Sequence, residues 1–189
     1  MSALTSAKTT FGRSSVSGIK ATVFGSSGFM GKYVVNKLGK IGSTVVLPYR
    51  GDEINMRHLK LCGDLGQINF VPSSIRSVED IEAAVAGSNV VINLLGKHLE
   101  TSRWNFNDVN ATFPGVLAEV CKEHGVERFV HVSSLGAELD SPSAWQRSKA
   151  LGEQAVKDAF PAATVFRPAT IFGDEDRFLN RIAKLSQLL

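Results

Sequence analysis

Six short apolar runs alternate with amphipathic stretches along this chain of 189 residues, and this alternation limits the fold more than any other feature. The first run, residues 20–24, is bounded by glycines and leads into a helical pattern over residues 30–38. Consecutive apolar positions are typical of strands that are buried on both faces, as in parallel sheets. We expect the other strands at residues 44–49, 68–71, 89–95, 128–133 and 164–167.

Helical patterns occupy the intervals at residues 78–86, 107–124 and 143–159, and Pro114 is expected to kink the second of these helices. Strands that alternate with helices through short turns predict an α/β fold, a doubly wound parallel sheet with right-handed crossovers. The expected strand order is 3-2-1-4-5-6. This order places ligands at the carboxyl ends of the strands, near the switch between the first and fourth strands.

A glycine-rich turn, Gly25-Ser26-Ser27-Gly28-Phe29-Met30-Gly31, joins the first strand to the first helix. In this pattern Gly25 permits a sharp turn, Gly28 lets the backbone approach a pyrophosphate, and Gly31 lets the helix pack on the strand. The helix N-terminus then presents free N–H groups and a positive dipole end to the phosphates. A tight turn without a ligand is the alternative, but the strand before it and the helix after it favour a dinucleotide site of Rossmann type.

Arg50 follows the second strand, where an NAD-selective protein usually carries an acidic residue that contacts the ribose 2′-hydroxyl. The planar donor fork of arginine suits a 2′-phosphate instead. Asp52 lies two residues further on and is the alternative contact to the ribose. The pattern therefore favours NADP over NAD.

Composition and spacing exclude several other classes of protein. With 21 basic and 18 acidic residues the net charge is only +3, which does not indicate a nucleic-acid-binding protein. The apolar runs are too short for a transmembrane segment. Cys62, Cys121 and the four histidines lack the spacing of metal ligands, so no metal site is expected.

The segment that ends at Lys149 is similar to a catalytic motif in which one residue has changed. Short-chain dehydrogenases carry Tyr-x-x-x-Lys on one helix face with a serine upstream; here Ser133 and Ser134 are followed by Trp145 and Lys149. An indole N–H donates a hydrogen bond but cannot serve as an acid or base near neutral pH. We therefore expect no catalysis, with Lys149 retained to bind the ribose hydroxyls.

Other polar residues lie near the predicted ligand edge. Asn93 ends the fourth strand and is a candidate ligand contact, whereas Asn110 is expected to brace the structure. Lys97 and His98 follow the fourth strand and could face the pocket. His131 is interpreted as a packed core histidine.

Longer segments, among them GRSSVSG at residues 12–18, ATVFGSSGFMGKYVVNKLG at 21–39 and FGDEDRFLN at 172–180, extend the comparison. Across residues 11–181 the chain resembles the Rossmann-type accessory subunits of mitochondrial complex I, in the atypical short-chain dehydrogenase/reductase superfamily. The resemblance implies a non-catalytic protein that binds NADPH, contacts other complex I subunits and lies on the matrix side of the inner membrane. The cofactor contacts it implies, with their neighbours in the same motifs, are Gly25, Ser27, Gly28, Phe29, Met30, Gly31, Arg50, Asn93, Leu94, Ser133 and Lys149.

The chain departs from the superfamily after the third strand, where an acidic residue often contacts adenine. Ser73 and Ser74 stand there, so that contact is lost or falls to Asp64. We expect residues 18–189 to form an NAD(P)-binding domain that lacks most of a C-terminal substrate portion. This would leave apolar side chains of the last helix in need of a partner.

Residues 1–17 are rich in serine and threonine and free of acidic residues, as in a targeting remnant or a flexible tail. Two other functions stay open at this stage. One is an active NADP-dependent reductase or epimerase, and the other is a free regulator that senses NADP(H).

Overall fold

The computed structural model describes residues 17–176 and 178–186, so the predicted tail lies outside the described residues except for Ser17. Six parallel strands form one sheet in the order β3-β2-β1-β4-β5-β6, which confirms the predicted fold class and strand order. The strands are β1 (Lys20–Phe24), β2 (Thr44–Tyr49), β3 (Ile68–Pro72), β4 (Val90–Asn93), β5 (Arg128–Val132) and β6 (Thr164–Phe166).

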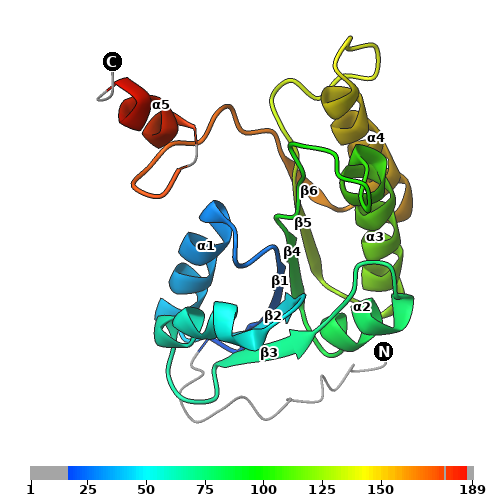
Figure 1. The fold of residues 1–189 in the computed structure, drawn as a ribbon. Coiled ribbons are helices and arrows are strands. Elements are labelled where there is room, and N and C mark those ends of the chain that lie inside the picture. Colours follow the sequence, from blue (N-terminus) through cyan, green and yellow to red (C-terminus); the bar gives the residue numbers. More distant parts are fainter. Residues whose placement is uncertain (1–16, 177, 187–189) are drawn as a thin grey trace.

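Helices cover both faces of the sheet (Figure 1). Helix α1 (Phe29–Lys40) and the 3₁₀ helix η1 (Glu53–Cys62) pack on one face. The other face is covered by α2 (Val78–Val85), α3 (Phe113–Glu123) and α4 (Ala144–Ala159). A further helix, α5 (Leu179–Ser186), stands apart from the sheet in Figure 1.

The side chains of β1 explain why its sequence is apolar at consecutive positions. Val23 belongs to the core beneath α1 and η1, whereas Phe24 belongs to the core beneath α2, α3 and α4. Phe24 packs edge-on against Phe113, with 5.4 Å between ring centroids. Both faces of this central strand are therefore buried, as expected for a sheet covered by helices on two sides.

Helix η1 was not predicted, because its sequence has no clear apolar period. Its start is fixed by Asp52, whose carboxylate accepts the backbone N–H of Ile54 at 2.9 Å. Met56 and Leu59 then bury their side chains against the α1 face of the sheet. Tertiary packing rather than intrinsic helix propensity thus stabilises this segment.

The predicted helix over residues 107–124 is divided next to Pro114: a π-helical turn, Asp108–Thr112, leads directly into α3, and a kink of the helix axis stays a prediction. Proline has no N–H, so the carbonyl of Asn110 loses the donor that a regular α-helix would supply four residues later. The same carbonyl faces Gly152 of α4, where any added Cβ would collide with it. The two helices therefore approach backbone to backbone, and this sets the position of α4.

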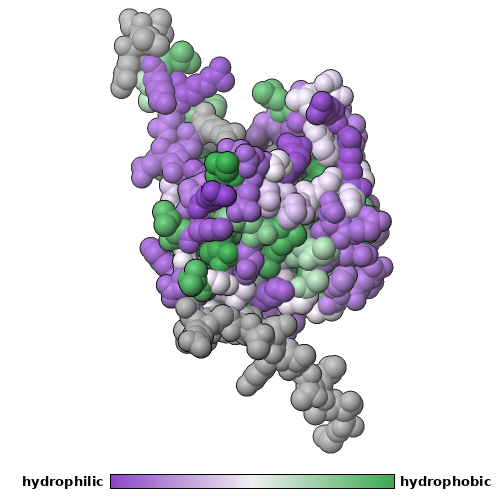
Figure 2. All heavy atoms as spheres, turned by 60° about the horizontal axis from the view of Figure 1, so that its bottom comes forward, coloured by the Kyte–Doolittle hydropathy of each residue, from purple (hydrophilic) through white to green (hydrophobic). Residues whose placement is uncertain are grey.

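Several apolar side chains lie at the surface. Leu61, at the end of η1, and Leu65, in the turn before β3, are 90% and 98% exposed. Figure 2 shows apolar side chains gathered between polar ones on one face. Along α5 the residues Leu179, Ile182 and Leu185 are exposed, as predicted, while Leu188 and Leu189 lie outside the described residues. Among the described helices none is both long and apolar enough to cross a bilayer.

Replacing Gly152 by alanine should destabilise the fold although alanine favours helices. The new methyl group would push α4 away from the Asn110 carbonyl, and overpacking of this kind costs about 1–3 kcal/mol. Gln154→Ala, at an exposed position of the same helix, should change the free energy of unfolding by no more than about 0.5 kcal/mol. Urea denaturation of both variants provides the measurement, and a Gly152→Ala variant as stable as wild type would contradict the close approach.

Candidate functional site

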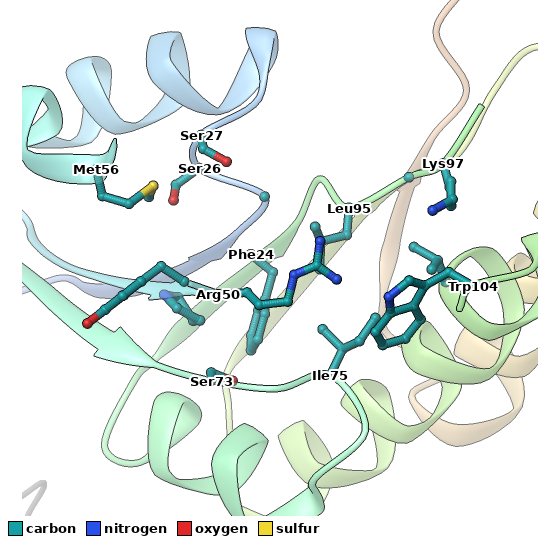
Figure 3. Close-up of a pocket in the computed structure, with 15 residues that line it drawn as sticks. Phe24, Ser26, Ser27, Arg50, Met56, Ser73, Ile75, Leu95, Lys97 and Trp104 are labelled. Carbon is teal, nitrogen blue, oxygen red and sulfur yellow. The ribbon is translucent and has the colours of Figure 1, made fainter. Parts of the chain in front are cut away.

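A cavity of about 300 Å³ lies at the carboxyl ends of the strands, near the switch between β1 and β4. Its walls come from the turn after β1, the ends of β2 and β3, and the segment between β4 and α3 (Figure 3). It lies at the edge of the sheet that the sequence predicted. The lining residues are Phe24, Gly25, Ser26, Ser27, Pro48, Tyr49, Arg50, Met56, Ser73, Ile75, Leu95, Gly96, Lys97, Trp104 and Val109.

The three glycines of the turn meet different requirements. Gly25 has a φ of +82°, and a Cβ there would lie 3.0 Å from the backbone of both Leu94 and Leu95. A Cβ at Gly31 would collide with the Gly25 carbonyl. Gly28 is different, since its φ is −73° and an added Cβ would meet only Gly25 O, at 3.2 Å. An added Cβ at Gly28 would be tight against this backbone carbonyl without the severe overlap found at Gly31, and the missing side chain also fits the close approach of a pyrophosphate.

The N-terminus of α1 is suited to bind an anion. It has no side-chain cap and no acidic residue in its first turn. By contrast, α2 is capped by the Ser77 hydroxyl, which accepts the Asp80 N–H at 3.1 Å, and it carries two acidic residues in its first turn. Free backbone donors and the helix dipole at the start of α1 therefore attract negative charge to the cavity.

Two serine hydroxyls at the cavity also fit a polar ligand. The Oγ atoms of Ser26 and Ser73 are buried, and neither has a hydrogen-bond partner among the described residues. Buried polar groups nearly always have partners, because an unpaired one is costly. Ligand hydroxyl or phosphate oxygens would satisfy both, so the cavity fits a dinucleotide at this end.

The charge of the cavity is positive. Arg50 and Lys97 line it, and no acidic side chain does so among the described residues. Asp52, the alternative ribose contact, caps η1 and is not part of the lining.

The alternative adenine contact, Asp64, is wrong. It lies in the turn before β3, where its backbone N–H and carbonyl form hydrogen bonds with Gln67. This turn is at the amino end of the strand, whereas the cavity is at the carboxyl ends. Ser73, which follows β3, lines the cavity instead. Asp64 precedes the predicted strand at residues 68–71, so its place at the amino end of that strand could have been inferred from the sequence.

Lys149 lies behind the cavity wall rather than in the lining. Its side chain is buried, and a Cβ at Gly96 would lie 2.9 Å from its Nζ atom. Burial lowers the pKa of the Lys149 ammonium to about 8, and the carboxylate of Glu153, one turn later, opposes this shift. Gly96 itself lines the cavity, so the Lys149 ammonium lies directly behind a residue of the lining.

Asn93 and Asn110 both brace the backbone around Lys149. Asn93 is fully buried; its Oδ1 accepts the Leu95 N–H at 3.0 Å, and its amide lies 3.2 Å from Nδ1 of His131. Asn110 accepts the Lys97 N–H at 3.1 Å and donates to the Ser148 hydroxyl at 3.0 Å. The bracing role expected for Asn110 is confirmed, and direct ligand contact by Asn93 stays a prediction.

His131 is a core residue, as expected. Burial lowers the pKa of its imidazole to about 4, with a further decrease from the nearby Lys149 ammonium and an opposing effect of Glu153. The ring is therefore neutral at physiological pH. Its Nδ1 atom then accepts from the Asn93 amide, which fixes the ends of β4 and β5 against each other.

Trp145 uses its only polar atom within the protein. Its Nε1–H donates to the carbonyl of Lys97 at 2.7 Å, and its ring lies 5.5 Å from that of His98. Lys97 thus faces the cavity as predicted, whereas His98 packs against Trp145. The indole joins α4 to the segment after β4, at the position where a dehydrogenase would hold its tyrosine.

The predicted site residues fall into three groups. Gly25, Ser27 and Arg50 line the cavity. Gly28, Phe29, Met30 and Gly31 form the start of α1 beside it, and Asn93, Leu94, Ser133 and Lys149 lie outside the lining. Trp104, Ile75 and Met56 line the cavity without having been predicted, because they come from loops and η1, where no periodic pattern marks them.

The chain matches two groups of known proteins. The NAD dependent epimerase/dehydratase family matches residues 21–187. NADH dehydrogenase (ubiquinone) 1 alpha subcomplex subunit 9, mitochondrial, is 54% identical in Mus musculus over 91% of this chain and 52% identical in Arabidopsis thaliana over 92% of it. The chain spans 46% and 43% of those two proteins, about half the length of its relatives. These matches confirm the resemblance that the longer sequence segments indicated.

Solved structures support the fold alone. The UDP-glucuronic acid 4-epimerase of Bacillus cereus, determined in complex with NAD, superposes with a TM-score of 0.70 over 88% of this chain and 64% of the epimerase. Sequence identity in that pair is 18%. Such a likeness shows the same arrangement of strands and helices without indicating a shared substrate.

We expect Lys149 to make the free energy of unfolding rise with pH between 8 and 10.5. Its pKa is about 8 in the folded chain against an ordinary value of 10.5. The unfolded chain therefore binds a proton in this window that the folded chain has lost, which favours folding by at most about 1.4 kcal/mol per pH unit. Lys149→Met, which keeps the apolar volume, should remove this rise in urea titrations.

Comparing wild type with Lys149→Met separates the titration of Lys149 from that of other groups. Burial raises the pKa of the Cys121 thiol to about 12, but this acts on wild type and variant alike and cancels in the difference. Parallel pH profiles for the two proteins would show that no buried ammonium titrates at position 149.

Proposed function

This chain belongs to the NAD dependent epimerase/dehydratase family, and we propose that it serves there as a non-catalytic, NADPH-binding accessory subunit of mitochondrial complex I. The observation that carries this proposal is the identity of 52–54% to proteins named as complex I subunits, over more than nine-tenths of the chain. Those relatives are about twice as long, so the role of the whole protein is inferred from the half that is shared.

The cavity supports NADPH as the nucleotide. The turn from Gly25 to Gly31 and the uncapped start of α1 would hold the pyrophosphate. Arg50 stands where an acidic residue would select NAD, and the nearby Asp52 is engaged in capping η1. We infer that Arg50 binds the 2′-phosphate, and that Lys149 and Ser133 approach the nicotinamide ribose from behind Gly96.

The absence of catalysis is supported by Trp145. Proton transfer to a substrate needs a group that can gain and lose a proton within reach of the reacting atom. The indole at this position has no such equilibrium, and its N–H already donates to Lys97 O. When NADPH is bound it would supply a hydride, but these residues offer no proton donor of the usual kind beside it.

The bound nucleotide then has a structural role. Anything that binds the folded form alone stabilises it by mass action. We propose that NADPH holds the loops at the carboxyl ends of the strands in one conformation. We further propose that the protein lies on the matrix side of the inner membrane, where other complex I subunits contact it. We propose that contacts with those subunits hold the protein at the membrane.

An active reductase or epimerase is the second candidate, favoured by the family itself and by the retained Lys149. It predicts NADPH oxidation, or epimerisation of a sugar nucleotide, that Lys149→Ala abolishes. A free regulator that senses NADP(H) is the third, and it predicts that the protein does not co-migrate with complex I on native gels.

Arg50→Ala should weaken NADPH binding by about 10–100-fold while leaving NADH binding nearly unchanged. The reason is the loss of a charge-assisted contact to the 2′-phosphate, a group that NADH lacks. Calorimetric titration with both nucleotides measures the ratio. Arg57→Ala, an exposed arginine of η1 that pairs with Glu53 rather than lining the cavity, is the matched control. The assignment is refuted if the NADPH-to-NADH affinity ratio of Arg50→Ala equals that of wild type.

Gly28→Val should abolish nucleotide binding and lower incorporation into complex I. The valine side chain would occupy the pyrophosphate site, and its Cβ would press on the Gly25 carbonyl at 3.2 Å, so thermal stability should fall as well. Native gels of detergent-extracted mitochondrial membranes measure incorporation of the variant. Asn69→Val, an exposed position in β3, controls for the added side chain. Full incorporation of a nucleotide-free Gly28→Val protein would show that NADPH has no part in assembly.

A further inference from the structure

Two arginines from different loops meet on one indole at the rim of the cavity. The guanidinium carbon of Arg76 lies 4.1 Å from the centroid of the Trp104 ring, and that of Arg50 lies 5.6 Å from it. Figure 3 shows Arg50 extending from the end of β2 across the cavity toward Trp104. Two like charges repel, and the face of the indole offsets part of that repulsion.

Trp104 is held firmly enough to position them. Its backbone pairs with Thr101 through two hydrogen bonds of 2.9 and 3.1 Å. Directly after it, Asn105 and Asp108 cap each other: the Asp108 N–H donates to Asn105 at 2.7 Å, and the Asn105 N–H donates to Asp108 at 3.2 Å. The indole is thus fixed on a short turn between β4 and α3, so its ring can hold the long side chains of Arg50 and Arg76 in place.

Arg76 has other partners, and they leave part of its charge available. One of its Nη atoms donates to the carbonyl of Arg103 at 2.6 Å and lies 3.8 Å from the Asp108 carboxylate. Its side chain is still 61% exposed. An arginine has five N–H donors, so these contacts occupy only a part of the fork.

The place of this cluster in the fold indicates which part of a dinucleotide it would meet. The pyrophosphate belongs at the start of α1, whereas Arg50 and Ser73 follow β2 and β3, on the adenosine side of the switch. Ser73 carries a buried hydroxyl without a partner among the described residues, three positions before Arg76. An oxygen atom of a bound ligand on this side of the cavity would satisfy the Ser73 hydroxyl.

Resting on the proposed binding of NADPH, we propose that Arg76 is a second cation of the adenosine 2′-phosphate subsite, and that Trp104 is the positioning residue that holds Arg76 and Arg50 on either flank of the phosphate. Two arginine forks can share the oxygens of one phosphate dianion. Selection of NADPH over NADH then depends on both arginines and on the aromatic face between them, and not on Arg50 alone.

The test compares nucleotides that differ only in this phosphate. The whole chain and its variants are titrated with NADPH and NADH, and with the fragments 2′,5′-ADP and 5′-AMP. Arg76→Ala should weaken NADPH and 2′,5′-ADP at least about tenfold, the effect of one charge-assisted contact, and NADH and 5′-AMP less than about twofold. Arg103→Ala removes an equal charge from the loop that carries Trp104, and it should behave as wild type. Neither Arg103 nor Arg76 belongs to the cavity lining, but of these two only the Arg76 guanidinium, and not that of Arg103, lies over the Trp104 ring among the described residues.

Trp104 is tested by rescue. Trp104→Phe keeps an aromatic face and should retain most of the preference for NADPH, whereas Trp104→Leu should lose it as Arg76→Ala does. A role that is only structural, as a tether between the loops, would weaken both nucleotides equally in Arg76→Ala, and that result overturns the proposal. So does an Arg76→Ala variant with unchanged affinity for NADPH.

The outcomes also separate this proposal from the one on which it rests. If wild type prefers NADPH and Arg50→Ala loses that preference while Arg76→Ala keeps it, the second cation is excluded and NADPH binding stands. If wild type binds NADPH and NADH equally, or binds neither, both proposals fail together.

Discussion

The close approach of the Gly25 backbone to the end of β4 is the constraint on which the site depends. At the switch of a doubly wound sheet the connections from β1 and β4 leave in opposite directions, so a crevice opens between them. Gly25, with its positive φ, brings the turn to within van der Waals contact of Leu94 and Leu95. The crevice is therefore narrow at its base and lined by backbone N–H groups, which is the geometry that binds a diphosphate.

Electrostatics then decides which nucleotide suits the crevice. A cavity with Arg50 and Lys97 in its lining and without a carboxylate among the described residues favours an additional phosphate. Two acidic residues that adjoin the lining segments are engaged by the backbone instead. Asp52 caps η1 and Asp80 accepts the backbone N–H of Ser74. These two carboxylates thus stabilise the loops around the cavity.

The dehydrogenase scaffold is preserved around a changed residue. Lys149 stays buried beside Gly96. One turn later, both carboxylate oxygens of Glu153 accept hydrogen bonds of 2.9 Å from Nε of Arg167. Those Arg167 hydrogen bonds lower the pKa of the Glu153 carboxyl even though burial raises it. The negative charge of Glu153 on α4 is therefore paired with the positive charge of Arg167. On the same helix, Trp145 packs against the loop after β4. This arrangement supports the proposed non-catalytic role.

The sequence by itself determined the order of strands and helices, the glycine turn and the basic residue after β2, because each depends on local periodicity or on a residue whose conformation is special. Only the tertiary structure decided which side chains share the cavity. Trp104 and Arg76 meet at its rim although they come from separate loops. The place of Asp64, by contrast, follows from the sequence, because a residue that precedes a strand lies at the amino end of that strand. Contacts between two loops depend on how the whole sheet and its helices pack. The local sequence of either loop does not indicate which residue of the other loop it will contact.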